Sequence, residues 1–129
     1  MMDRETVYGH LRALGWNAER SDDRTFRCVH GTAEGELVVF VRTDENWFMA
    51  SVSPLLETRG DNPFALARWL LRMNRDMHQT KFAYDRLGNV VLMVELPLES
   101  LDASEIETAL RGLLDRAVQH RRTLREASA

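Results

Sequence analysis

The spacing of the apolar residues changes at Trp16, and this change restricts the possible folds more than any other feature of the sequence. Residues 3–14 carry apolar side chains at helical spacing and are followed by Gly15, a residue type that commonly ends helices. From Trp16 to Leu56 the pattern changes to that of β strands, with apolar residues in alternation or in short unbroken runs. We expect strands at residues 25–30, 36–42 and 46–53. The loop at residues 31–35 is short enough for a hairpin, so the simplest arrangement is a meander of three or four antiparallel strands.

The second half of the chain predicts a helix followed by a β hairpin. Pro63, after a break in the pattern, suits the first position of a helix that runs to about Met77. Strands at residues 81–85 and 90–96 flank a turn in which Gly88 can adopt a positive φ angle. This second group of strands is therefore separated from the first by one helix.

The last helix has the clearest start signal in the sequence. Asp102 as N-cap and Glu105 three residues later form a capping box, and Leu101 and Ile106 stand where a hydrophobic staple would. The order of elements is therefore α-β-β-β-α-β-β-α, and a further short strand near Trp16 is an open alternative. No repeat or long linker divides the chain. We expect one α+β domain over residues 1–129, a twisted antiparallel sheet flanked by helices.

Length, charge and cysteine content exclude several classes of protein. A chain of 129 residues is the size of one domain, and its net charge of −3 argues against a dedicated nucleic-acid or anionic-membrane binder. The longest apolar runs, at residues 37–41 and 90–94, are far shorter than the ~20 residues of a membrane helix. Cys28 is the lone cysteine and cannot form an intramolecular disulfide, which fits a reducing compartment. We therefore expect a cytoplasmic protein that does not associate with membranes.

No motif in the sequence indicates catalysis. The four histidines lack the spacings of a metal site, so surface or structural roles are expected for His10, His30, His78 and His120. Cys28 alternates with Phe26 on an expected strand, which favours a buried thiol that acts as a small apolar group. The carboxylate pairs Asp22-Asp23 and Asp44-Glu45 fall in turns and lack the alternating spacing of calcium ligands. We expect no enzyme activity, no cofactor and no metal ion.

Arginines gather on two of the expected helices. One side of the middle helix carries Arg68, Arg72 and Arg75, and the end of the last helix carries Arg121, Arg122 and Arg125. The first group suggests a solvated face. The second suits a helix C-terminus, where cations offset the exposed carbonyl groups. A nucleic-acid partner is not expected, because no aromatic residues alternate with the arginines of the last helix.

The middle helix is apolar over a wider arc than a single contact requires. At about 100° per residue its apolar side chains span about 220°, whereas a helix that packs on one sheet needs a stripe about 100° wide. The arc contains Phe64, Leu66, Ala67, Trp69, Leu70, Leu71, Met73 and Met77, and it is interrupted by Asn74 and His78. The excess is covered either by another helix of the chain or by a second copy in a homodimer. We expect the homodimer, with Phe64, Ala67 and Leu71 or the opposite flank of Trp69 and Met73 in the interface, and with Leu70 among the partner-binding residues.

Four short segments of the second half resemble a known family. They are residues 70–74 (LLRMN), 81–85 (KFAYD), 88–92 (GNVVL) and 94–98 (VELPL), followed by the capped last helix. This pattern resembles the YbjN-like family of bacterial sensory transduction regulators, and the order of elements resembles the type III secretion chaperone fold that this family shares. The resemblance implies a homodimeric, non-enzymatic module whose sheet and flanking helix hold an extended segment of another protein. It implies no catalytic residues.

Three functional hypotheses follow from these observations. The first is a dimeric, chaperone-like or regulatory module that binds another protein through apolar surface. The second is a small-molecule sensor or enzyme that uses a pocket between the sheet and the helices. The third is a nucleic-acid-linked regulator that uses the arginine clusters.

Overall fold

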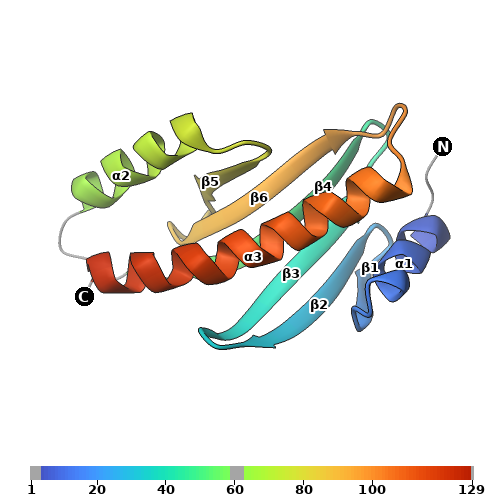
Figure 1. The fold of residues 1–129 in the computed structure, drawn as a ribbon, viewed down its shortest axis with the longest axis horizontal. Coiled ribbons are helices and arrows are strands. Elements are labelled where there is room, and N and C mark those ends of the chain that lie inside the picture. Colours follow the sequence, from blue (N-terminus) through green and yellow to red (C-terminus); the bar gives the residue numbers. More distant parts are fainter. Residues whose placement is uncertain (1–3, 59–62, 129) are drawn as a thin grey trace.

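The computed structural model describes residues 4–58 and 63–128, which form three helices and six strands. In chain order these elements are α1 (Arg4–Ala13), β1 (Ala18–Asp22), β2 (Thr25–Thr32), β3 (Gly35–Thr43), β4 (Trp47–Leu56), α2 (Pro63–Asp76), β5 (Thr80–Tyr84), β6 (Val90–Pro97) and α3 (Ala103–Ser128). The expected order is confirmed, and β1 is the further strand near Trp16 that the sequence left open. All six strands form one antiparallel sheet in the order β1-β2-β3-β4-β6-β5 (Figure 1).

Helix α1 ends at Ala13, just before Gly15, the residue that the sequence predicts to stop it. Gly15 has a φ angle of 76° and donates its N–H to the carbonyl oxygen of Arg12 at 2.9 Å, while the N–H of Trp16 donates to Leu11 at 2.9 Å. These two bonds are the Schellman pattern, which needs a residue that tolerates positive φ. The chain then turns directly into β1.

The strand boundaries differ from the expected ones most at the β2–β3 hairpin and at the end of β4. The β2–β3 hairpin pairs as far as Thr32 and Gly35, so its turn is shorter than the expected loop at residues 31–35. Strand β4 continues to Leu56 rather than stopping near residue 53, because Leu55 and Leu56 are buried and Leu56 pairs with Val90 across a register shift. Both differences lengthen the sheet.

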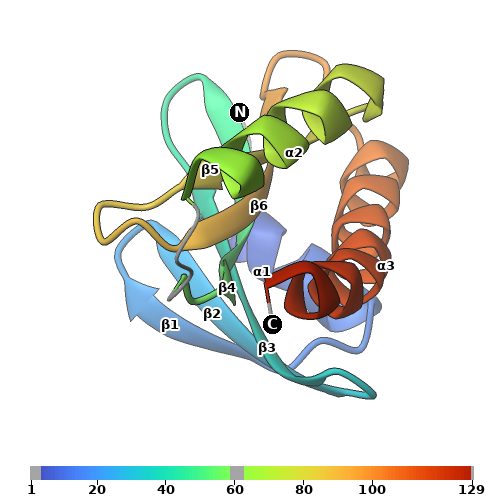
Figure 2. The ribbon, with the colours of Figure 1, turned by 90° about the vertical axis from the view of Figure 1, so that its left-hand side faces the viewer.

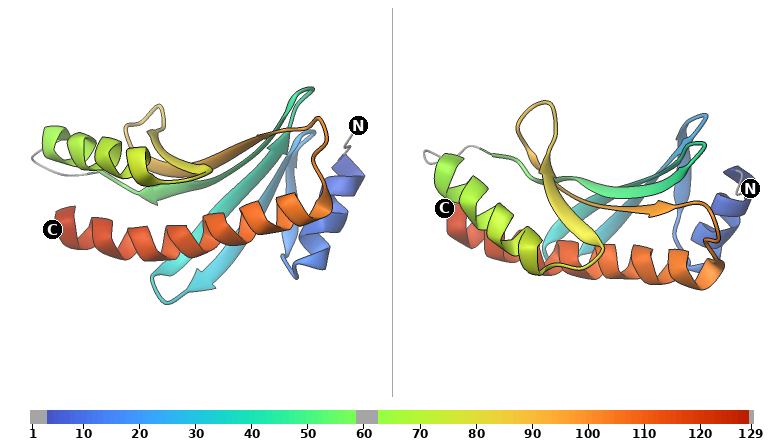
Figure 3. Two further views of the ribbon diagram at one scale, coloured as in Figure 1. Left: turned by 45° about the horizontal axis from the view of Figure 1, so that its top comes forward. Right: turned by 90° about the horizontal axis from the view of Figure 1, so that it is seen from above.

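One face of the sheet holds the hydrophobic core. Strand residues that alternate along β2, β3, β4 and β6 are nearly inaccessible on this face: Phe26, Cys28, Leu37, Val39, Val41, Phe48, Ala50, Val52, Leu92 and Val94. Helix α3 runs across this face and α1 lies near β1, as the two views in Figure 3 show. One face of α3 packs on this core, where Ile106, Leu110, Leu113, Ala117 and Leu124 are each at most 1 % exposed. Buried apolar side chains therefore line the layer between the sheet and α3.

The predicted start of α3 is also confirmed. The N–H of Glu105 donates to Oδ1 of Asp102 at 2.8 Å, and α3 begins at Ala103. Leu101 packs against the core that contains Ile106, as expected for a hydrophobic staple. This cap sets where α3 enters the core.

Candidate partner-binding surface

Helix α2 lies beside the last strand of the sheet and not across its face (Figure 2). Its position is set by Asn74, whose Nδ2 donates to the carbonyl oxygen of Phe82 at 3.1 Å and whose Oδ1 accepts the N–H of Phe82 at 2.7 Å. A side-chain amide that accepts and donates in this way substitutes for a neighbouring strand. Helix α2 thus covers part of a sheet edge that would otherwise present unpaired backbone groups.

Lys81 on β5 makes a second set of hydrogen bonds to α2. Its Nζ donates to the carbonyl oxygens of Asn74 at 2.6 Å and Met77 at 2.8 Å, at the C-terminal end of α2. Carbonyl groups at a helix C-terminus lack intrahelical donors and carry partial negative charge, so a lysine there is stabilising. Between α2 and β5 the chain turns through Gln79, whose φ angle is 66°. The short connection and these bonds hold α2 alongside β5.

The two flanks of α2 have different surroundings. On one flank the ring of Trp69 lies 6.0 Å from the ring of Phe82, and Leu70 is only 4 % exposed. Met73 is half-buried against the core. This flank is occupied by the chain itself.

The other flank of α2 carries the most exposed apolar side chains of the helix. Phe64 is 81 % exposed and Leu71 is 69 % exposed, and Ala67 is half-buried between them. We call Phe64, Ala67 and Leu71 the apolar stripe. Their spacing of three and four residues places them in line along one side of α2. Large apolar side chains this exposed on an ordered helix are unusual in a protein that buries the rest of its core well.

A row of basic side chains runs beside the apolar stripe. We call Arg68, Arg72 and Arg75 the arginine row; all three are exposed, as the sequence suggested. Arg75 lies 3.2 Å from the carboxylate of Asp76. Within residues 4–58 and 63–128, Arg68 and Arg72 have no ion-pair partner. The open side of α2 is therefore half apolar and half cationic.

The structure thus separates the six residues predicted to bind a partner. Leu70, Trp69 and Met73 pack toward β5 and the core, while Phe64, Ala67 and Leu71 form the open stripe. Sequence reasoning did not identify Asn74 as the residue that positions α2. The sequence did contain a signal, because Asn74 is one of two polar residues that interrupt the apolar arc, and its side chain points toward β5.

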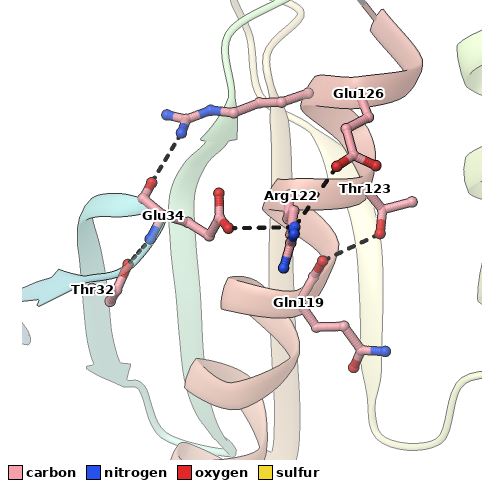
Figure 4. Close-up of polar contacts among 7 residues, drawn as sticks. Thr32, Glu34, Gln119, Arg122, Thr123 and Glu126 are labelled. Carbon is pink, nitrogen blue, oxygen red and sulfur yellow. Dashed lines mark hydrogen bonds and ion pairs between the residues drawn. The ribbon is translucent and has the colours of Figure 1, made fainter.

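The arginines at the end of α3 contact the β2–β3 hairpin, a contact that the sequence did not predict. Arg121 donates from Nη1 to the carbonyl oxygen of Glu36 at 2.6 Å, and Arg125 donates from Nη1 to that of Glu34 at 3.0 Å. Arg122 lies 3.9 Å from the Glu34 carboxylate and 3.7 Å from that of Glu126 (Figure 4). These contacts join the end of α3 to the β2–β3 hairpin. The accepting carbonyl groups belong to Glu34 in the hairpin turn and to Glu36 near the start of β3.

Cys28 and His120 are buried, and His30 is half-buried. Cys28 is fully buried, and burial raises the pKa of its thiol to about 11, so it is protonated at neutral pH. The ring of His30 lies 4.4 Å from that of Trp16, and burial lowers the pKa of His30. Burial also lowers the pKa of His120, with a smaller contribution from the Arg116 charge. The thiol is in the environment expected of a small apolar group.

Two of the turn carboxylates stabilise the turns themselves. Oδ1 of Asp44 accepts the N–H groups of Asn46 and Trp47, each at 2.8 Å, and these bonds lower the pKa of Asp44. Oδ1 of Asp22 accepts the N–H of Arg24 at 2.8 Å. Among the described residues, no group of three or more histidine, cysteine, aspartate and glutamate side chains is arranged to hold a metal ion. No helix in residues 4–58 or 63–128 has the length and hydropathy needed to span a membrane.

Comparison with known proteins gives a consistent result. The model of the family YbjN, described as "Putative bacterial sensory transduction regulator", matches residues 3–126. No curated protein matches the chain.

Several solved structures share this fold. A chain in the heterodimeric ExoU–SpcU complex from the type III secretion system of Pseudomonas aeruginosa is 26 % identical, with a TM-score of 0.59 over 96 % of this chain and 94 % of that one. The Yersinia pestis type III secretion chaperone SycH, solved in complex with a stable fragment of YscM2, gives 16 % identity and a TM-score of 0.58 over 88 % of this chain and 94 % of that one. YbjN from E. coli, described as "a putative transcription regulator", gives 15 % identity and a TM-score of 0.66 over 91 % of this chain and 86 % of that one. The α+β fold is that of the type III secretion chaperones.

Proposed function

The chain belongs to the YbjN family, and from this premise we propose that it is a non-enzymatic protein-binding module, chaperone-like or regulatory, that acts as a homodimer. Its partner is a second protein, held as an extended segment. The proposal includes a cytoplasmic location, for which the lone buried thiol is the support. We also propose that the protein is not an enzyme. In support, the carboxylates of Asp22 and Asp44 accept hydrogen bonds from backbone N–H groups of their own turns.

The apolar stripe of α2 is the observation that carries the homodimer. Phe64 and Leu71 lie two helical turns apart, so an antiparallel contact with a second copy brings Phe64 of each chain against Leu71 of the other. Ala67, between them, is small enough for the two helices to approach closely at the twofold axis. Full burial of a Phe or Leu side chain contributes about 1.5–3 kcal/mol, so four such side chains supply a substantial part of a dimer's stability.

The protein partner is supported by the solved relatives and by the free face of the sheet. Two of the similar structures hold a second protein, as a heterodimeric complex in one case and as a fragment bound to a chaperone in the other. On the sheet face away from α3, Val29 is 37 % exposed, and Val38, Phe40 and Met49 are half-buried. This face offers apolar contacts to an extended segment in addition to those on α2.

The homodimer is tested by sedimentation velocity at micromolar concentrations. We expect wild-type protein to be a dimer, and Leu71→Glu to be a folded monomer, because a charge buried in an apolar contact costs several kcal/mol. Leu87→Glu is the matched control, since Leu87 is 86 % exposed on the β5–β6 turn. A wild-type monomer would overturn the homodimer, and equal effects of the two substitutions would overturn its placement on the apolar stripe.

The protein partner is tested by affinity capture from the native host with wild-type protein and the Leu71→Glu variant as baits. The captured protein is then produced separately and mixed with wild type, and we expect a complex of fixed stoichiometry in light scattering. Native mass spectrometry of protein purified from the host tests the alternative, a bound small molecule. A tightly held small molecule there, with no protein complex, would favour the sensor hypothesis instead.

A further inference from the structure

The segment that contains α2 and β5 has a net charge opposite in sign to that of the whole chain. Residues 63–89 contain five basic and two acidic residues, a net charge of +3, whereas the whole chain carries −3. The arginine row supplies three of these five basic residues, and all three side chains are exposed. The remaining residues of the chain are therefore net acidic when taken together, and the arginine row places exposed positive charge beside the apolar stripe.

The spacing of the arginine row determines where it lies in the proposed dimer. Arg68, Arg72 and Arg75 are separated by four and three residues, so they follow one line along α2, adjacent to the apolar stripe. In an antiparallel pair, the twofold axis is perpendicular to both helices and maps each arginine row to the same side of the pair. The two Arg68 side chains then lie nearest the axis and the two Arg75 side chains lie farthest from it.

We propose that in the homodimer the two arginine rows form one continuous basic ridge across the twofold axis, and that this ridge binds an acidic segment of a partner protein. The inference rests on the proposed homodimer and adds the chemistry of the partner. Each row extends about 10 Å along its helix, so the ridge is about 20 Å long. An extended segment of about six or seven residues spans this length.

The charge distribution favours an acidic protein segment over a nucleic acid. A nucleic acid is a long, continuous polyanion, and the residues outside 63–89 are net acidic when taken together. A short acidic segment places its carboxylates on the ridge alone. Guanidinium groups also match carboxylates in bidentate geometry, which adds orientation to the attraction.

The ridge has a consequence for dimer stability that can be measured without the partner. Six like charges along one helix pair repel one another, and the two Arg68 groups do so most strongly because they lie nearest the axis. Added salt should therefore strengthen the dimer, because it screens this repulsion. An acidic peptide should strengthen it at lower concentration, since it binds the dimer and not the monomer.

The test measures binding of a fluorescent octaglutamate peptide to the full chain by anisotropy at low ionic strength. We expect one peptide per two chains and an affinity that falls as salt is raised. The double variant Arg68→Gln/Arg72→Gln removes four charges of the ridge and should weaken binding about tenfold. The control Arg24→Gln/Arg111→Gln removes the same number of exposed charges elsewhere and should change it less than about twofold.

Sedimentation of the same samples without peptide separates the two proposals. A dimer that does not bind octaglutamate, or that binds one peptide per chain, overturns the ridge and leaves the homodimer intact. The same holds if both double variants lower the affinity for octaglutamate equally. Tighter binding of an octathymidylate than of octaglutamate overturns the protein segment as occupant. A monomeric wild type overturns the homodimer itself, and the shared ridge with it.

Discussion

At the scale of single residues, His120 is a titratable side chain within the apolar layer. Its ring lies 5.1 Å from that of Phe82, edge to face, and it is 7 % exposed. On its own helix the charge of Arg116 acts on it. From the sheet, the uncharged ring of Phe82 on β5 faces it.

This environment makes folding stability depend on pH. Because the pKa of His120 is lowered in the folded state, the unfolded chain binds the proton first, and stability present above the ordinary histidine pKa of about 6.5 is lost as pH falls through and below it. We expect the denaturation midpoint to drop between about pH 7 and pH 5, and to drop less in His120→Gln. His30→Gln is measured separately, because burial lowers the pKa of His30 as well. Identical pH profiles for wild type and His120→Gln would contradict this account.

The thiol of Cys28 should be unreactive in the folded protein because it is buried. Its thiol is fully buried and has a pKa raised to about 11, so the nucleophilic thiolate is scarce and inaccessible. We expect iodoacetamide to label native protein slowly and unfolded protein readily, and Cys28→Ser to keep partner binding. Rapid labelling of the native protein at neutral pH would mean that the thiol is activated.

At the scale of elements, the start of α3 depends on one side chain. Asp102 accepts the N–H of Glu105 at 2.8 Å and so satisfies a helix donor that has no intrahelical partner. Asp102→Ala should lower the free energy of unfolding by about 1 kcal/mol, whereas Asp102→Asn, which can still accept this bond, should cost less. Unchanged denaturation midpoints in the alanine variant would show that this cap contributes nothing to stability.

The attachment of α2 to β5 depends on Asn74. Its amide makes two hydrogen bonds to the backbone of Phe82, and Asn74→Leu would leave both partly buried backbone groups unpaired. We expect a loss of about 2–4 kcal/mol in unfolding free energy and faster hydrogen exchange at Phe82. Asn46→Leu, at an exposed asparagine in the β3–β4 turn, is the control and should change stability by less than about 0.5 kcal/mol. Equal losses in both variants would mean that the Asn74 amide has no special role.

At the scale of the whole molecule, the two flanks of α2 have different surroundings. Trp69→Glu places a charge against Phe82 and the core and should destabilise the fold by several kcal/mol, while Leu71→Glu should leave the monomer folded. Circular dichroism with thermal denaturation distinguishes the two outcomes. A Leu71→Glu chain that unfolds like Trp69→Glu would mean that the apolar stripe stabilises the monomer itself.

Features that depend on residues close together in the chain were predictable from the sequence. Gly15 ends α1 and Asp102 starts α3, because each forms hydrogen bonds within a few residues of itself. The inward faces of the strands and of α3 were also predictable, since burial follows the local period of apolar residues. Strand β1 gave no such signal. Its five residues carry four exposed side chains, and it is a strand because it pairs with β2.

The tertiary structure alone decided which side of α2 is open. The apolar arc of this helix extends to both flanks in the sequence, and no local rule distinguishes Trp69 from Leu71. The choice follows from the two bonds of Asn74 to Phe82, which fix the rotation of α2 against β5 and turn Leu71 outward. Likewise, Arg121 and Arg125 reach a hairpin about 90 residues earlier in the chain. Such contacts arise from how the sheet and helices pack, because they join residues whose separation in the sequence carries no periodic signal.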